Sequence, residues 1–179
     1  MILNTVPFAV DILPECLEKE PNDSSQTAQP VTLPLIVNGR MDHPGDRDVF
    51  HFAGRAGERI FAEVQARRLD SPLDSVLKVT DAAGKRLAFN DDHEDKSDGL
   101  KTHHADSLID FSLPADGKYY LYLSDAQHES GPEYAYRLRG KYQYIKVTFL
   151  LQQWQVSVHQ GHSLNGFLGR VYGSSLRSG

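Results

Sequence analysis

Six consecutive residues near the N-terminus, Glu18-Lys19-Glu20-Pro21-Asn22-Asp23, contain three carboxylates and one amide. In an extended backbone, side chains two residues apart share one face, so Glu18, Glu20 and Asn22 should point the same way. Asp23 follows at a turn, after Pro21 has restricted the backbone. Oxygen donors of this kind are the ligands of Ca²⁺, which takes about six to eight of them. The spacing therefore indicates a calcium site, and the alternative is a solvated acidic turn.

A second group of possible metal ligands follows the middle of the chain. If strands bring them together, Asp74, Asp91, Asp92 and Asp106 could bind a second Ca²⁺. Histidine prefers transition metals, so His103 and His104 together with Asp91 could bind Zn²⁺ instead. Adjacent histidines on a strand point to opposite faces, which counts against one shared ion. The alternatives are a hydrogen-bonded surface loop or a loop that binds a partner.

Known catalytic motifs are missing from the sequence. It contains neither the His-Glu-x-x-His pattern of zinc proteases nor the Gly-x-Ser-x-Gly pattern of serine hydrolases. We therefore expect a protein that is not an enzyme. A metal-dependent hydrolase fragment that uses the His103–His104 loop is the alternative function.

Charge and hydropathy exclude several classes of protein. The first 140 residues contain all 24 acidic residues, and residues 141–179 contain four basic residues and no acid. The excess of acidic residues in the first 140 positions argues against nucleic acid as a partner, because phosphate binding needs a basic surface. No apolar run is long enough to span a membrane, and residues 1–10 lack the basic start of a signal peptide.

The elements that must position these ligands are short strands. Apolar runs recur between turns rich in Gly, Pro and Asp, without a long helical period. The segment Arg59–Ala66 shows the pattern well, since Ala62, Val64 and Ala66 alternate with the polar residues Glu63 and Gln65. The expected strands are Val31–Val37, Asp48–Phe52, Arg59–Ala66, Ser75–Asp81, Arg86–Asn90, Ser107–Leu113, Lys118–Ser124 and Tyr134–Arg139. About eight strands at this spacing predict an all-β, antiparallel, jelly-roll-like β-sandwich.

An ordered set of motifs resembles the bacterial pre-peptidase C-terminal domain. The set comprises Glu18–Asp23, Asn38-Gly39-Arg40, Gly45–Phe50, Ala56-Gly57-Glu58, Ser71–Asp74, Asp81–Gly84, Asn90-Asp91-Asp92 and Gly117–Tyr120. The resemblance covers about residues 15–139. That family is a β-sandwich attached to secreted collagenases, other exported bacterial proteins and large surface proteins of planctomycete type. In collagenase members the acidic segment before the first strand binds calcium.

The resemblance implies a function and a set of ligands. Glu18, Glu20, Asn22 and Asp23 match the calcium-binding segment, and Asp46 and Asp48 match a later Gly-Asp-x-Asp element that can complete the site. It implies a non-catalytic accessory module of a secreted or cell-surface protein. The expected partners are neighbouring domains of a larger polypeptide, and protein or polysaccharide. We expect an N-terminal linker at 1–17, the sandwich at 18–140, and extra strands, a following domain or a non-native tail at 141–179.

Overall fold

The structure is a computed structural model that describes residues 7, 9–92 and 105–142. It consists of two five-stranded sheets and one short 3₁₀ helix, η1 (Arg67–Leu69). The first sheet contains β1 (Glu15–Leu17), β3 (Leu35–Arg40), β10 (Ala135–Tyr142), β5 (Arg59–Gln65) and β8 (Leu108–Ser112), in that order. The second contains β2 (Gln29–Pro30), β4 (Arg47–Gly54), β9 (Gly117–Asp125), β6 (Ser75–Asp81) and β7 (Arg86–Asn90).

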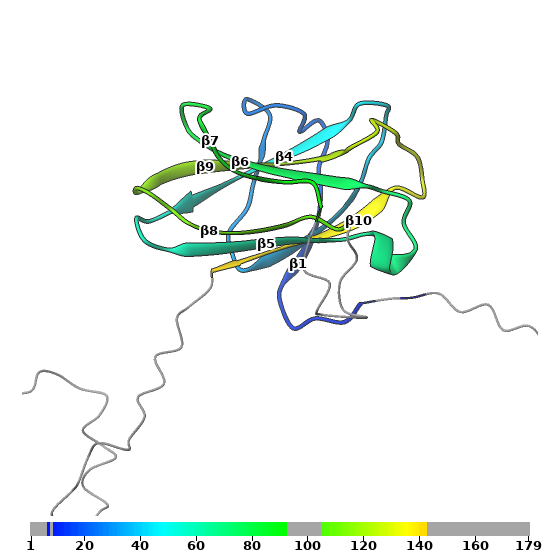
Figure 1. Cartoon of the computed structure of the whole chain (residues 1–179), viewed down its shortest axis with the longest axis horizontal. Helices are drawn as coiled ribbons and strands as arrows, with labels where there is room; N and C mark the ends of the chain where they lie inside the picture. Colours follow the sequence, from blue (N-terminus) through cyan, green and yellow to red (C-terminus); the bar gives the residue numbers. More distant parts are fainter. Residues whose placement is uncertain (1–6, 8, 93–104, 143–179) are drawn as a thin grey trace, which may run out of the picture. The chain divides into compact units, whose positions relative to one another are not determined.

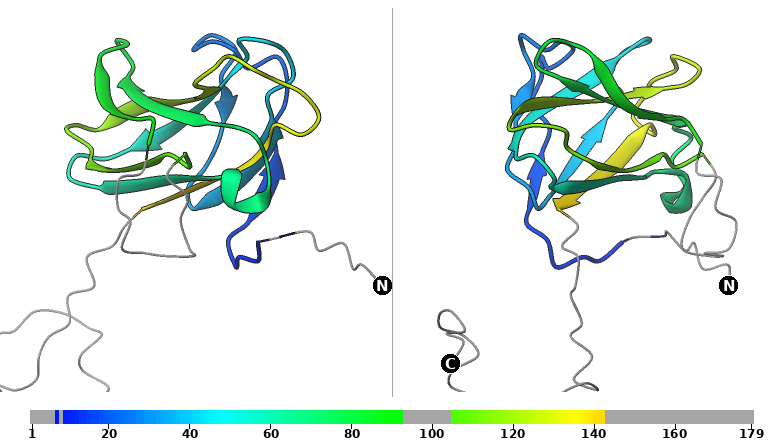
Figure 2. Two further views of the ribbon diagram at one scale, coloured as in Figure 1. Left: turned by 45° about the vertical axis from the view of Figure 1, so that its right-hand side comes forward. Right: turned by 60° about the vertical axis from the view of Figure 1, so that its left-hand side comes forward.

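The two sheets form separate layers. In Figure 1, β4, β6, β7 and β9 lie in one layer, and β1, β5, β8 and β10 lie in the other. The two further views in Figure 2 show the same layers from other sides. From β3 to β10, every connection crosses between the sheets except the β6–β7 hairpin. The orders β3-β10-β5-β8 and β4-β9-β6-β7 are those of a jelly roll, so the predicted fold class is confirmed.

The core follows from alternation along the strands. In β9, Tyr119, Leu121 and Leu123 are buried while the residues between them are only partly covered. Phe52 of β4 stacks on Tyr119, with ring centroids 5.7 Å apart. Such period-two patterning places one face of each sheet inside and leaves the other face outside. The two outer faces are therefore free to bear functional side chains.

Each of the eight expected strands overlaps an observed one, although Val31–Val37 is displaced, because β3 begins at Leu35 and ends at Arg40. Two further strands were missed. β1 pairs in parallel with β3, and β2 pairs in parallel with β4. Three and two residues are too short to show a sequence period, which explains why neither was predicted. Both are exceptions to the antiparallel pairing that was expected.

The expected linker at residues 1–17 is attached to the first sheet. It contains β1, and Asp11 forms an ion pair with Arg139 at 2.6 Å. Glu15 forms a second ion pair with Arg137 at 2.8 Å. Ile36 lies on the outward face of β3 yet is only 1% exposed, and its N–H donates to the Pro14 carbonyl. Residues 11–17 thus belong to the sandwich, while most of 141–179 lies outside the described residues.

Among the described residues, no helix is long and apolar enough to cross a membrane.

Candidate metal centre

The first acidic segment lies between β1 and β2, at one end of the sandwich. Glu18 directly follows β1, and its N–H donates to the Asn38 carbonyl of β3 at 3.0 Å. The Glu20–Pro21 peptide bond is cis, and the Asn22 carbonyl accepts from Val49 N–H of β4 at 3.0 Å. These backbone contacts attach the segment to one strand of each sheet. It therefore bridges the two layers at the point where Asp48 of β4 is buried.

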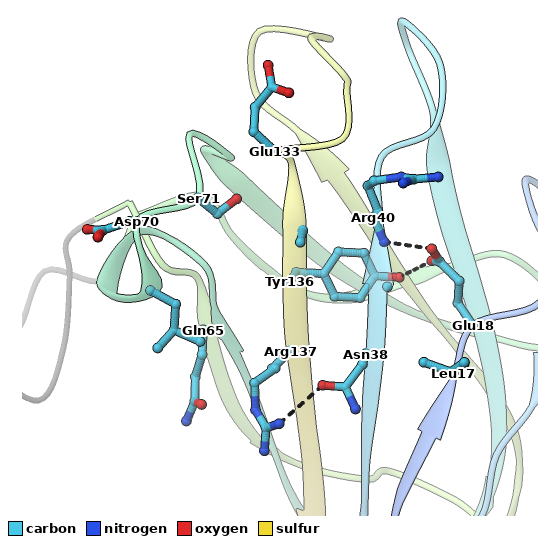
Figure 3. A pocket seen from close by; sticks show the side chains of 13 residues that line it. Leu17, Glu18, Asn38, Arg40, Gln65, Asp70, Ser71, Glu133, Tyr136 and Arg137 are labelled. Carbon is cyan, nitrogen blue, oxygen red and sulfur yellow. Dashed lines mark hydrogen bonds between the residues drawn. The ribbon is translucent and has the colours of Figure 1, made fainter. Parts of the chain in front are cut away.

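Three carboxylates meet at this bridge. Ligand oxygens of Glu18, Glu20 and Asp48 lie within 4.8 Å of one another. Glu18 accepts from the backbone N–H of Arg40 at 2.6 Å and from the Tyr136 hydroxyl at 2.6 Å, as Figure 3 shows. The Tyr136 hydroxyl also lies 2.6 Å from Asp48 Oδ2, whereas Asp48 Oδ1 is buried and has no hydrogen-bond partner among the described residues.

A second group of ligands adjoins the first in sequence. Ligand atoms of Asp23, His43 and Asp46 lie within 4.8 Å of one another. Asp46 Oδ2 accepts from Asp42 N–H at 2.6 Å, and Asp46 Oδ1 accepts from Arg47 N–H at 2.8 Å. His43 Nε2 lies 3.5 Å from Asp46 Oδ1. The Asp46 carboxyl is thus already held by the β3–β4 turn, and Asp23 Oδ1 is buried without a partner among the described residues.

Asn22 is the most unusual polar residue in this region. It is 0% exposed, and neither its side-chain oxygen nor its side-chain nitrogen has a partner among the described residues. Leaving such an amide buried and unpaired costs about 1–3 kcal/mol. A cation that accepts the amide oxygen as a ligand would offset that cost.

Burial and mutual repulsion raise the pKa values of two of these carboxyls, Asp48 and Glu18. Burial, and then the charge of Glu18, raise the pKa of Asp48 to about 10. Burial also raises the pKa of Glu18, against the hydrogen bond from Tyr136. Burial and the two adjacent carboxylates raise the pKa of the Tyr136 hydroxyl well above its ordinary value. Without a cation the group therefore retains protons at neutral pH, and a divalent cation would replace them.

A glycine makes room for the centre. A side chain on Gly39 of β3 would overlap the Glu18 carboxylate and the Tyr136 hydroxyl. Glu18, Gly39 and Tyr136 also border an open hollow of about 710 Å³, shown in Figure 3. One side of the centre is thus accessible to solvent. The other side faces the buried end of β4.

Five of the six predicted ligands fall into the two groups of donors, and the sixth is the buried Asn22. Sequence reasoning missed His43 and Tyr136. His43 lies three residues before Asp46, which is a local signal. Tyr136 has no such signal, because it reaches Asp48 across 88 residues of sequence. That an ion binds these residues remains a prediction.

The second predicted metal site is not assembled by the described residues. Among the described residues there are two groups of metal-binding side chains, the two groups described above. Neither contains Asp74, Asp91, Asp92 or Asp106. Asp106 is 0% exposed and accepts from the N–H groups of Ala66 and Arg67 at 3.0 and 2.8 Å. It also pairs with Arg68 at 2.7 Å, so its carboxylate serves the η1 turn. Asp91 and Asp92 are exposed, and His103 and His104 lie outside the described residues.

A comparison with known sequences relates the chain to part of a bacterial protease. No model of a protein family matches the chain. The chain is 41% identical over 108 residues to a probable subtilase-type serine protease of Deinococcus radiodurans. The match spans 59% of this chain and 14% of the length of that relative. The chain thus resembles one part of a much longer protein.

Two bacterial proteins are among the solved structures that resemble the chain weakly. One is the pre-peptidase C-terminal domain of collagenase from Bacillus anthracis, with 17% identity, coverage of 69% of this chain and 100% of that one, and a TM-score of 0.49. The other is PliG of Aeromonas hydrophila, a periplasmic inhibitor of g-type lysozyme, with 16% identity, coverage of 72% and 99%, and a TM-score of 0.46. Both TM-scores lie below 0.5, so these likenesses carry no argument about the function of this chain or about an ion.

Proposed function

We propose that this chain is a non-catalytic accessory module of a larger exported bacterial protein, and that Ca²⁺ at the candidate metal centre stabilises it. The observation that supports this best is the group of Glu18, Glu20 and Asp48, in which Asp48 is buried, Glu18 is half-buried and Glu20 is exposed. Among the described residues, no Lys or Arg forms an ion pair with any of the three. Buried charges without a partner are costly, so proteins pair them or use them to bind metals.

The chemistry of the donors favours calcium. Carboxylate and amide oxygens predominate, and hard oxygen ligands suit Ca²⁺ better than transition metals. Glu18, Glu20 and Asp48 would hold one position, and Asp23 and Asp46 would supply oxygens beside it. The Asn22 side-chain oxygen is a further donor that lacks a partner among the described residues. His43 is the single nitrogen donor, and it is largely exposed.

The position of the centre suggests what the ion does. Four of the ligands belong to residues 18–23, and the other two belong to the start of β4 and the turn before it. An ion held by both would fasten the N-terminal segment to the sandwich. It would add about 2.7 kcal/mol to the free energy of unfolding at a hundredfold excess over Kd. Calcium is abundant outside cells, so a weak site with a Kd of about 10⁻⁴–10⁻³ M would suffice.

The module would act beside other domains. The chain spans 14% of the length of its protease relative, so we infer that it belongs to a larger polypeptide. A fastened N-terminal segment would set the direction in which the preceding domain leaves the sandwich. In this proposal a neighbouring domain performs any catalysis.

Thermal melts with and without calcium test the proposal. We expect 5 mM Ca²⁺ to raise Tm relative to EDTA by about 4–8 °C, which corresponds to about 1–2 kcal/mol for a domain of this size. Glu20→Gln should remove most of that shift. Glu129→Gln, which neutralises an exposed carboxylate after β9, is the matched control and should keep the shift.

Two results would contradict the proposal. One is a Tm that EDTA leaves unchanged together with no heat of Ca²⁺ binding in a calorimetric titration. The other is a larger shift with Zn²⁺ than with Ca²⁺ that His43→Ala removes, since this would assign the centre to a transition metal.

A further inference from the structure

The outward face of the second sheet gathers aromatic rings and cations. Residues that pair across neighbouring strands share a face of the sheet. One row across β4, β9, β6 and β7 is Val49, Tyr122, Lys78 and Phe89. The next row is His51, Tyr120, Thr80 and Arg86. The four strands lie side by side in one layer, as Figure 1 shows.

Charge on this face is of one sign. Two further outward pairs of β4 and β9 flank these rows, Ala53 with Lys118 and Arg47 with Ser124. The face thus has four cations, which are Lys78, Arg86, Lys118 and Arg47. The acidic residues of these strands, Asp48, Asp81 and Asp125, occupy the alternate positions that face away from it. Among the described residues, none of the four cations forms an ion pair. This basic face belongs to a chain whose net charge is −5.

The rings hold the cations across the face. Lys78 Nζ lies 4.1 Å from the centroid of the Tyr122 ring, and Arg47 Cζ lies 5.8 Å from the same centroid. Arg86 Cζ lies 5.5 Å from the centroid of Phe89, which is 48% exposed. Contacts of this kind restrict long side chains that would otherwise be mobile. Three of the four cations, Lys78, Arg47 and Arg86, are therefore positioned before any ligand arrives.

The cations also repel one another. Burial, followed by the charges of Arg47 and Arg86, lowers the pKa of Lys78. Burial, followed by the charge of Lys118, lowers the pKa of His51. An anion on this face would relieve the repulsion, because it would supply the negative charge that the described residues do not provide here.

A small hollow lies at one end of the face. It has a volume of about 270 Å³ and is bordered by His51, Lys118 and Tyr142 together with the apolar side chains of Val31 and Leu33. A mixed lining of this kind suits a ring with hydroxyl groups on its rim and C–H groups on its faces. His51 also contacts Tyr120 edge to face, with ring centroids 6.1 Å apart.

We propose that this basic face, made of the outward residues of β4, β9, β6 and β7, binds an acidic polysaccharide. Carboxylates on the sugars would pair with Lys78, Arg86 and Lys118, and sugar hydroxyls would meet the Tyr120 and Tyr122 hydroxyls. The inference rests on the proposed accessory role, for which it supplies a ligand, but not on calcium. Single-stranded nucleic acid is the competing polyanion. It binds by stacking its bases on exposed aromatic rings, and of the described rings on this face only Phe89 is exposed.

Affinity electrophoresis tests the inference. The whole chain is run in native gels containing hyaluronan, polygalacturonate fragments or neutral dextran, and is separately titrated with oligo(dT). We expect both uronate polymers to retard the protein, dextran to leave its mobility unchanged, and 0.5 M salt to abolish the retardation. Lys78→Gln combined with Arg86→Gln should weaken binding by about fivefold or more, since exposed charge pairs each contribute modestly.

Matched variants make the outcome unambiguous. Arg55→Gln combined with Lys141→Gln removes the same charge from a turn and from the opposite sheet, and should leave binding unchanged. All variants should keep the Tm shift caused by calcium, which separates failure of this inference from failure of the proposed metal centre. Absence of retardation by both uronate polymers, equal losses in the two double variants, or tighter binding of oligo(dT) would overturn the inference.

Discussion

Tyr136 and Asp48 are joined by a hydrogen bond of 2.6 Å between the tyrosine hydroxyl and Asp48 Oδ2, inside the sandwich and across 88 residues of sequence. The same hydroxyl lies 2.6 Å from Glu18 Oε2, so one phenol connects the acidic N-terminal segment with β4. A hydroxyl has one proton to donate. At least one of the two carboxyls must therefore hold its own proton or bind a cation.

Tyr136→Phe should destabilise the protein by about 1–3 kcal/mol, because it leaves buried carboxyl oxygens without their donor. It should also weaken calcium binding, since Glu18 and Asp48 would lose a common support. Urea unfolding with and without Ca²⁺ measures both effects. Tyr120→Phe, on the outward face of β9, should change neither, and an equal response of the two variants would contradict the assigned role.

Stability in EDTA should fall as pH rises. The pKa of Asp48 is raised from its ordinary value of 3.8 to about 10 on folding, so between these values the folded state binds more protons than the unfolded state. The free energy of unfolding then decreases with increasing pH. The raised pKa of Glu18 acts in the same direction. Urea melts in EDTA at pH 5, 7 and 9 should show the decline.

Asp48→Asn tests whether Asp48 is the group that makes the free energy of unfolding depend on pH. In EDTA at pH 9 the variant should be more stable than the unmodified chain, because a neutral amide replaces a carboxyl that resists ionisation. It should also lose most of the calcium-dependent Tm shift. A pH slope as steep in the variant as in the unmodified chain would exclude Asp48 as its source.

Gly39→Ala should destabilise the protein by about 1–3 kcal/mol and weaken calcium binding. The added methyl group would overlap the Glu18 carboxylate and the Tyr136 hydroxyl, and both must then move. Gly117→Ala is the matched control, because nothing lies within 4 Å of the position its Cβ would take. Thermal melts and calorimetric titration of both variants give the comparison.

Asp106→Ala should cost about 3–5 kcal/mol of stability, because it removes one of the two carboxylates paired with Arg68 and leaves the N–H groups of Ala66 and Arg67 without their acceptor. The calcium-dependent Tm shift should persist, since Asp106 belongs to the η1 turn and not to the candidate metal centre. Asp110→Ala breaks the more exposed Arg59–Asp110 pair and should cost less than about 1 kcal/mol. Similar losses in both variants would contradict this assignment.

Much of the fold could be predicted because it depends on local patterns. The alternation in Arg59–Gln65 and the turns around Gly57, Gly84 and Gly117 place the strands without knowledge of their partners. β1 and β2 escaped prediction because three and two residues show no period and their pairing with β3 and β4 is decided at a distance. The attachment of residues 11–17 depends on ion pairs with Arg137 and Arg139 more than 120 positions away.

In the candidate sites, too, some features could be predicted from the sequence and others depend on the tertiary structure. The spacing of Glu18, Glu20 and Asn22 is a property of the sequence, because side chains two residues apart in an extended segment share a face whatever surrounds them. Only the tertiary structure brings Asp48 and Tyr136 to these residues, because the contacts join distant strands. Likewise, only the tertiary structure shows that the Asp106 carboxylate is already bonded to the η1 turn. The basic face likewise exists only in the folded protein. Its rings and cations are scattered over four strands, and their common side is fixed by the register in which those strands pair.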